Sequence, residues 1–325
     1  MADHVETMAY AGETPWHGLG TEIPPGVSTD EMLKLSGLDW LVTKEKLYLG
    51  DNTEVPKMRA IVRDTDKKII SIVGSTYKVT QNYEVLGFFH KFVEAGNMEL
   101  ETAGSLHGGQ YVWCLARVKR DFVIGKDDEV RTYLLFCNPH IYGYSRSIKF
   151  TGVRVVCWNT LNFALGANLT GRNTRGLTFN IPHSIDFDEV SRAAAEKALG
   201  IALTQSAEFE EATKLFAKTK LKQEALDSYF NTILKFDPET AKLRKDGTVR
   251  LPSMLNKFNE ALESAPGQDF KSCKGTLWGA LNAVTYVIDH DMGRTRDNGL
   301  TSAWFGYTGD IKRKAFEIAL ELVKR

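Results

Sequence analysis

The first half of the chain alternates between short helical patterns and strand-like patterns of apolar residues. Residues 28–36 open with Ser28 and Thr29 before two acids, which predicts a short capped helix. Between Lys57 and Val79, apolar and polar positions alternate on both sides of Asp64-Thr65-Asp66, and this pattern predicts a hairpin. A helix-spaced apolar stripe then runs from Asn82 to Gly96, which predicts an amphipathic helix.

Three strand-like runs follow that helix. They cover residues 98–104, 110–120 and 130–137, and Gly108-Gly109 marks the turn between the first two. Short connections of this kind predict a meander of antiparallel strands. Residues 151–166 return to a spacing of three and four between apolar residues, which predicts a helix.

The pattern changes near Pro182, and the remainder of the chain is helical in composition. Five further helices are predicted, at residues 187–219, 221–236, 252–264, 276–289 and 310–323. The predicted fold is therefore α+β, with a mainly antiparallel sheet and helices in residues 1–185 and a helical domain in residues 186–325.

Composition adds that this is a globular protein. Of the 325 residues, 43% are hydrophobic and 25% are charged, which excludes disordered and collagen-like classes. The first 20 residues carry acids and no apolar run, and no stretch of 18 apolar residues occurs, so neither a signal peptide nor a membrane span is expected. The four cysteines are scattered, three of them among apolar residues. We therefore expect a cytoplasmic protein with no membrane partner.

The formal net charge of zero hides an uneven distribution. Residues 1–130 hold 14 basic and 20 acidic side chains, whereas residues 186–325 hold 21 of each. The segment between them, residues 131–185, holds six basic side chains and no acid. A basic segment of this kind suits an anionic partner, unless its charges pair with acids elsewhere in the fold.

Residues 131–185 are also rich in aromatic and asparagine side chains. Cations for phosphates, flat rings for bases and amides for polar contacts are what a groove for single-stranded nucleic acid requires. The alternative interpretation is a buried sheet and core helix, which commonly lack acids. The candidate nucleic-acid-binding residues are Arg146, Lys149, Arg154, Arg172, Arg175, Tyr142, Tyr144, Phe150, Asn159 and Asn162.

Sequence motifs for catalysis are largely missing. The chain has no nucleotide-binding P-loop, no dinucleotide fingerprint, and no motif of the serine hydrolases, zinc proteases or zinc deaminases. We therefore expect no cofactor, no resident metal and no catalytic residue. Asp289-His290-Asp291 leaves one alternative open, a nuclease or phosphohydrolase that uses a divalent metal.

Three patches give the chain a family resemblance, namely residues 15–20, 108–160 and 276–322. Together they resemble the phage/plasmid-like family built on a bacterial and phage domain of unknown function. The resemblance covers nearly the whole chain, and the last patch is its most specific part. It implies a protein of a mobile element that works in a bacterial cytoplasm.

A second resemblance lies in the order of elements across residues 82–166. A helix, a hairpin, further antiparallel strands and a helix are similar to the core of phage single-strand annealing proteins of the RecT, Red-beta and ERF kind. That resemblance implies a homo-oligomer, a ring or filament, that binds and anneals single-stranded DNA without ATP. It also implies partners such as a phage exonuclease or a host single-strand-binding protein. A non-enzymatic phage protein for anti-defence or assembly stays open as another hypothesis.

Overall fold

The computed structural model describes residues 4–12, 19–156, 159–162, 178–187, 189–242, 251–292 and 307–324. The chain divides into two compact units, and neither is continuous in sequence. Unit 1 comprises residues 1–119, 132–150 and 178–202, and unit 2 comprises residues 120–131, 151–177 and 203–325. The boundary predicted between residues 185 and 186 falls inside the last segment of unit 1.

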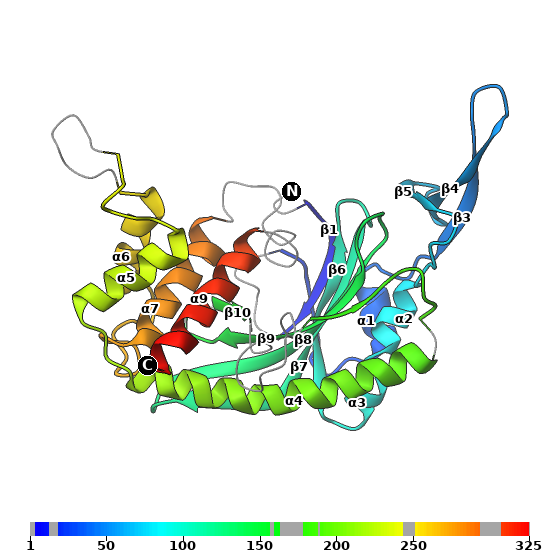
Figure 1. The fold of residues 1–325 in the computed structure, drawn as a ribbon. Helices are drawn as coiled ribbons and strands as arrows, with labels where there is room; N and C mark the ends of the chain where they lie inside the picture. Colours follow the sequence, from blue (N-terminus) through cyan, green and yellow to red (C-terminus); the bar gives the residue numbers. More distant parts are fainter. Residues whose placement is uncertain are drawn as a thin grey trace. The chain divides into compact units, whose positions relative to one another are not determined.

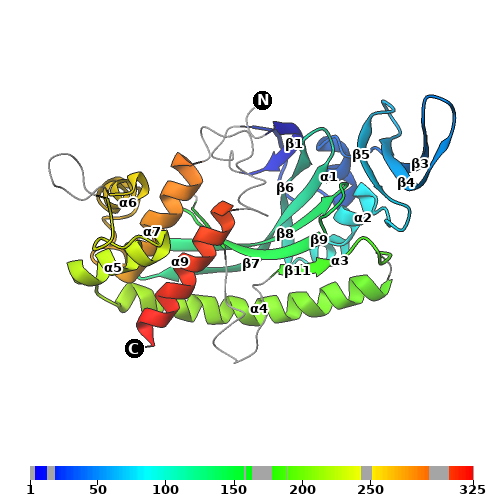
Figure 2. The same ribbon diagram turned by 45° about the horizontal axis from the view of Figure 1, so that its top comes forward.

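Unit 1 contains most of a large sheet. Its strands lie in the order β9-β8-β7-β6-β1-β2, with β11 paired to β9. Figure 1 labels β1 and β6 to β9 of this sheet, and Figure 2 labels β11. The bounds are β1 Val5–Ala11, β2 Thr21–Ile23, β6 Met98–Leu106, β7 Tyr111–Ile124, β8 Asp128–Pro139, β9 Arg146–Arg154 and β11 Thr178–Ile181. The neighbours β6, β7 and β8 confirm the predicted three-stranded run. The predicted α+β class is also confirmed.

A second sheet in unit 1 has three strands in the order β3-β4-β5. The strands are β3 Val42–Tyr48, β4 Glu54–Arg63 and β5 Ile69–Gly74, and both pairings are antiparallel. The hairpin predicted around Asp64-Thr65-Asp66 is therefore confirmed as β4–β5. Val42, Ile61 and Val73 are buried on one face, which anchors the sheet to unit 1.

Short helices complete unit 1, and their ends follow local side-chain chemistry. In α1, Thr29–Leu35, the Ser28 side chain accepts from the backbone of Glu31, whose carboxylate accepts from the backbone of Ser28. The single helix predicted over residues 82–96 forms two pieces, α2 Asn82–Gly87 and α3 His90–Glu94. Between them, Phe88 packs edge-on against Phe136 of β8, with ring centroids 5.5 Å apart.

Unit 2 is mainly helical (Figure 2). Helix α4, Glu189–Lys218, begins in unit 1 and ends here, and α5 Gln223–Leu234, α6 Ser253–Ser264, α7 Leu277–Tyr286 and α9 Tyr307–Val323 follow. A five-residue π-helical segment, η2 Val287–Asp291, continues α7. Phe316 stacks on Phe209 and meets Phe216 edge-on, both at 5.3 Å between ring centroids. All five helices predicted from composition are confirmed.

The helix predicted at residues 151–166 is wrong in its described part. Strand β9 continues to Arg154, and β10, Asn159–Asn162, pairs with it in antiparallel register. The segment contains β-branched Val153, Val155 and Val156, which suit a strand, and apolar spacing over so few residues fits either structure. Residues 163–166 lie outside the described part of the chain.

A search for membrane spans gave a negative result. Within the residues that the structure describes, no helix combines the length and the apolar character needed to cross a bilayer.

Candidate nucleic-acid interface

Arg146, predicted to hold a phosphate, is fully buried in unit 1. Its Nη1 donates to Oγ1 of Thr80 at 3.0 Å, and its other donors bond to backbone carbonyl oxygens of Ile181, Pro182 and Ile185. Its Cζ also lies 5.5 Å from the ring centroid of Phe187. This guanidinium therefore holds the polypeptide together, and its predicted role as a DNA contact is wrong.

The other predicted residues lie in different surroundings. Phe150 is 3% exposed, so it belongs to the core and has no free stacking face, which corrects that prediction as well. Lys149 is partly exposed on β9, opposite Thr178 of β11. The backbones of Arg154 and Asn159 are partners in the β9–β10 register, and Asn162 ends β10. Arg172 and Arg175 lie outside the described residues.

Tyr142 and Tyr144 are the predicted stacking residues that the structure leaves accessible. They lie in the loop between β8 and β9, and their side chains are 76% and 42% exposed. Gly143 between them has a φ of 88°, a conformation that glycine adopts without strain. The loop thus turns sharply and presents two tyrosines on the surface of unit 1.

Tyr144 is the end of a row of four rings, which we call the aromatic row: His4, His107, Tyr111 and Tyr144. Successive centroids are 4.6 Å apart for His4–His107 and 5.8 Å apart for both His107–Tyr111 and Tyr111–Tyr144. His4 is exposed, His107 is half-buried and Tyr111 is buried, so accessible rings lie at both ends. The row joins the start of β1, the β6–β7 turn and the β8–β9 loop at one edge of unit 1.

Local electrostatics favour the uncharged forms of the two inner rings of this row, His107 and Tyr111. Burial lowers the pKa of His107, and the neighbouring His4 lowers it further. Burial also raises the pKa of Tyr111, with a contribution from its hydrogen bond to Tyr144. Burial raises the pKa of Cys137 to about 12, and Lys149 on strand β9 acts in the opposite direction.

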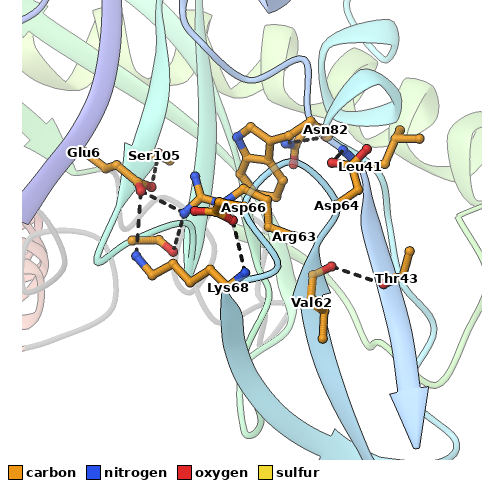
Figure 3. A network of polar contacts seen from close by, with 12 residues as sticks. Glu6, Leu41, Thr43, Val62, Arg63, Asp64, Asp66, Lys68, Asn82 and Ser105 are labelled. Atoms are coloured by element: carbon orange, nitrogen blue, oxygen red, sulfur yellow. Dashed lines mark hydrogen bonds and ion pairs between the residues drawn. The ribbon is translucent and has the colours of Figure 1, made fainter.

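An ionic network holds the turn that carries His107 (Figure 3). Arg63 donates to Glu6 at 2.8 Å and to the carbonyl oxygen of Gly108 at 3.4 Å, and its Nε lies 3.2 Å from Oδ1 of Asp66. Lys68 lies 3.7 Å from the same Glu6 carboxylate, which also accepts from Ser105 at 3.1 Å. These contacts tie β1, β4 and the β6–β7 turn together, and they fix the His4 end of the aromatic row.

Comparison with known proteins gives one match. A family model described as a domain of unknown function, DUF932, matches residues 69–304. The chain belongs to the DUF932 family. The matched part includes His107, Tyr111 and Tyr144, while His4 precedes it. No curated protein and no solved structure matches this DUF932 chain.

Two buried histidines anchor the exposed tyrosine loop of this DUF932 protein. His140 is fully buried, its Nε2 lies 3.2 Å from Oδ1 of Asn82, and its backbone N–H donates to Gln110 at 2.7 Å. Burial, followed by the charge of His183, lowers the pKa of His140 to about 3. His183 stacks on Tyr77 at 4.3 Å, and burial lowers its pKa to about 4. Both rings are therefore neutral packing groups at the base of the loop.

In unit 2, the side chains of Asp289, His290 and Asp291 have different partners. Asp289 forms a buried ion pair with Lys312, with Nζ 2.6 Å from Oδ1. His290 packs on Tyr286 at 4.5 Å, and Asp291 lies 3.9 Å from Lys257. Across the described ranges, no group of three His, Cys, Asp or Glu side chains is placed to hold a metal ion. The metal-dependent alternative therefore gains no support from the described geometry.

Sequence reasoning missed three members of the aromatic row. His4, His107 and Tyr111 lie outside the basic segment, and no local spacing connects them to Tyr144. The one available signal was the Gly108-Gly109 turn, because a tight turn between paired strands brings residues 106 and 111 opposite each other. The contact with Tyr144 depends on the packing of the β8–β9 loop, which the sequence pattern does not encode.

Proposed function

We propose that this DUF932 chain binds single-stranded DNA, with the aromatic row and the neighbouring tyrosine loop as its base-stacking surface. The observation that carries the proposal is the continuity of the row, which ends in Tyr144 beside the 76% exposed Tyr142. Rings supported from beneath by other rings offer a stable face to an unpaired base. Stacking of a base on an aromatic side chain contributes about 1–3 kcal/mol and tolerates any sequence.

The overall charge of the chain suits binding of a single strand better than binding of a duplex. Lys149 lies on the adjoining strand β9, while the whole chain is neutral and has no excess charge for non-specific duplex binding. Arg154, Arg172, Arg175, Asn159 and Asn162 remain proposed contacts, on the grounds of sequence alone. Arg146 and Phe150 are no longer among them.

Binding to single strands leads to the wider role that we propose, which is ATP-independent annealing in recombination. In that role the protein is a homo-oligomer, a ring or filament, of a phage or plasmid in the bacterial cytoplasm. A phage exonuclease that exposes single strands, or a host single-strand-binding protein, would be its partner. The absence of a P-loop motif from the sequence is compatible with annealing, because strand pairing needs no nucleotide hydrolysis.

The test is an oligonucleotide titration of the wild type and the double variant Tyr142→Ala/Tyr144→Ala. Loss of each ring should weaken binding to single-stranded DNA about tenfold, since each removes one stacking face. Tyr83→Ala is the matched control, because Tyr83 is 52% exposed elsewhere on unit 1, and its affinity should equal that of the wild type.

Salt dependence separates this mechanism from purely apolar binding. Affinity should fall as salt rises from 50 to 200 mM, with a logarithmic slope of about 0.7 for each phosphate contact. Wild-type protein that fails to bind oligonucleotides at low salt would refute the proposal. Equal affinity of the wild type and the double variant would refute the aromatic row as the site.

A further inference from the structure

The turn between β6 and β7 has two backbone donors that the fold leaves unused. It comprises residues 107–110, and its first three residues, His107, Gly108 and Gly109, have φ values of 52°, 68° and 90°. The N–H group of His107 donates to the carbonyl oxygen of His4 at 2.9 Å. The N–H groups of Gly108 and Gly109 donate to no residue that the structure describes. Successive N–H groups that are free in a tight turn form a concave site for an anion.

Lys68 places an ammonium group against the same turn. Its Nζ occupies the space that a Cβ on Gly108 would need, so the glycine makes room for the ammonium. The nearest anionic atom is Oε1 of Glu6 at 3.7 Å, beyond hydrogen-bond distance (Figure 3). Both oxygens of that carboxylate already accept hydrogen bonds, Oε1 from Arg63 and Oε2 from Ser105. Among the described residues, the ammonium of Lys68 is therefore held by charge while its hydrogen-bond donors stay unused.

The turn is held in place from one side and open to solvent on another. Arg63 donates to the carbonyl oxygen of Gly108 at 3.4 Å. Because this peptide bond is trans and planar, the N–H of Gly109 points away from that carbonyl oxygen and hence away from Arg63. The side chain of Lys68 is 44% exposed and Gly108 is half-buried, so a ligand in solution can reach this part of the turn.

We propose that Lys68 and the N–H groups of Gly108 and Gly109 form a subsite for a phosphate group of single-stranded DNA. A phosphate offers negative charge to the ammonium and several oxygen atoms that can accept from all three groups. Gly108 directly follows His107 of the aromatic row, so a strand whose bases stack on the row has phosphates close to this turn. The inference rests on the proposed function, to which it adds the contact that holds the backbone.

The charges around the subsite favour a phosphate within a strand over a free phosphate ion. Glu6 and Asp66 balance Arg63 and Lys68, so the ionic network carries no net charge. A phosphodiester brings a single negative charge to this neutral surface. A free phosphate ion brings more charge near the same two carboxylates and has no base to stack on the aromatic row.

The experiment is an oligonucleotide titration of the full chain at several salt concentrations. Lys68→Gln removes one phosphate contact, so it should weaken binding to single-stranded DNA several-fold at about 50 mM salt and lower the logarithmic salt slope by about 0.7. Lys68→Arg keeps the charge and should keep the slope. Lys57→Gln is the matched control, because Lys57 is exposed on β4 and its loss changes the net charge equally. Its slope should equal that of the wild type.

Gly108→Ala tests the subsite without a change of net charge. The added Cβ displaces the ammonium of Lys68 from the turn, and the affinity should fall several-fold. The double variant Lys68→Gln/Gly108→Ala should bind about as weakly as Lys68→Gln alone, because both substitutions remove the same contact. Losses that add in full would show that the alanine acts on the structure of the turn, and they would overturn the subsite.

Amide resonances of the two glycines identify the ligand. The signals of Gly108 and Gly109 should shift when single-stranded DNA is added to the wild type. They should stay in place with inorganic phosphate at the same phosphate concentration and ionic strength. Equal shifts with inorganic phosphate would overturn a DNA strand as the ligand of this turn.

The same titrations separate the subsite from the proposed function. If Lys68→Gln and Lys57→Gln have the same slope and affinity, the subsite is overturned, and the proposed function stands as long as Tyr142→Ala/Tyr144→Ala still binds weakly. If Lys68→Gln lowers the slope while the tyrosine variant binds like the wild type, the subsite stands and the aromatic row fails. A wild type that binds no single strand overturns both.

Discussion

Arg146 in unit 1 and Lys312 in unit 2 are both buried cations, and their surroundings satisfy them in opposite ways. In unit 1, every hydrogen-bond acceptor of Arg146 is uncharged: one hydroxyl and three backbone carbonyl groups. In unit 2, Lys312 is 1% exposed and donates to the carboxylate of Asp289. A planar guanidinium with five donors can bond to several carbonyl groups at once, whereas a compact ammonium group is better matched by one anion.

This difference explains why a sequence segment rich in basic residues need not form a positively charged surface. The carbonyl groups that receive Arg146 lie 35 to 39 positions away in sequence, and no acid is needed nearby. An acid-free stretch can therefore accommodate a buried arginine without local charge pairing. Counting charges along the chain overestimates the charge available to a nucleic acid.

The largest expected effect comes from removing Arg146. Arg146→Met should lower the free energy of unfolding by roughly 4 kcal/mol, because it leaves several buried carbonyl groups without a donor. Arg146→Lys should recover only part of the loss, since one ammonium cannot reproduce the geometry of the guanidinium. Denaturant unfolding measures both variants. If Arg146→Lys were as stable as the wild type, a positive charge alone would be enough at this position. Arg146 would then not differ from Lys312 in what it requires of its surroundings.

A smaller loss of stability is expected when Lys312 of unit 2 is replaced. Lys312→Met should cost about 3 kcal/mol, because it leaves the Asp289 carboxylate buried without its cation. The double variant Lys312→Met/Asp289→Leu should be close to the wild type in stability, because it removes both charges together. Denaturant unfolding of the two variants and of Asp289→Leu completes a double-mutant cycle. Additive losses in that cycle would contradict a coupled pair.

The smallest effect of a single residue, about 2 kcal/mol between pH 7 and pH 5, is a dependence of stability on pH that arises in unit 1. The pKa values of His140 and His183, about 3 and about 4, lie below the value of 6.5 expected in the unfolded chain. The unfolded state therefore binds more protons between pH 6.5 and 4, and the native state loses stability as the pH falls. Each histidine contributes a slope of about 1.4 kcal/mol per pH unit within that range.

Unfolding measured from pH 7 to pH 5 tests this expectation. His140→Gln should reduce the slope by about half. His90→Gln is the matched control, a histidine substitution at an exposed position on α3. An identical slope in all three proteins would locate the acid sensitivity in other groups.

Local chemistry made part of the fold predictable. The capping box of α1 lies within four consecutive residues, and the β4–β5 turn lies within Asp64-Thr65-Asp66, so a short window contains the cause of each element. The long helices of residues 186–325 are predictable from composition for the same reason. Residues 151–154 and 159–162 were not predictable in this way, because their strand conformation comes from pairing between β9 and β10 and not from their own spacing.

The candidate site was less predictable than the fold. The sequence placed Tyr142 and Tyr144 together in one loop, and the structure leaves both accessible, while their role in binding stays a prediction. It could not indicate that Arg146 is buried, because the acceptors come from distant segments of the chain. The other rings of the aromatic row are likewise contributed by β1, the β6–β7 turn and β7, and their proximity is a product of tertiary packing.

The discontinuity of the two units has a practical consequence for dissecting this protein. Unit 2 is assembled from three stretches of the chain, and β7, β8, β9 and α4 each cross from one unit into the other. No single cut through the chain releases either unit whole. Truncation at residue 185 would remove residues 186–202 from unit 1, and with them the part of α4 that belongs to this unit. Point substitutions in the full-length chain are therefore the appropriate way to assign roles to its parts, and shortened fragments would confuse loss of a function with loss of a fold.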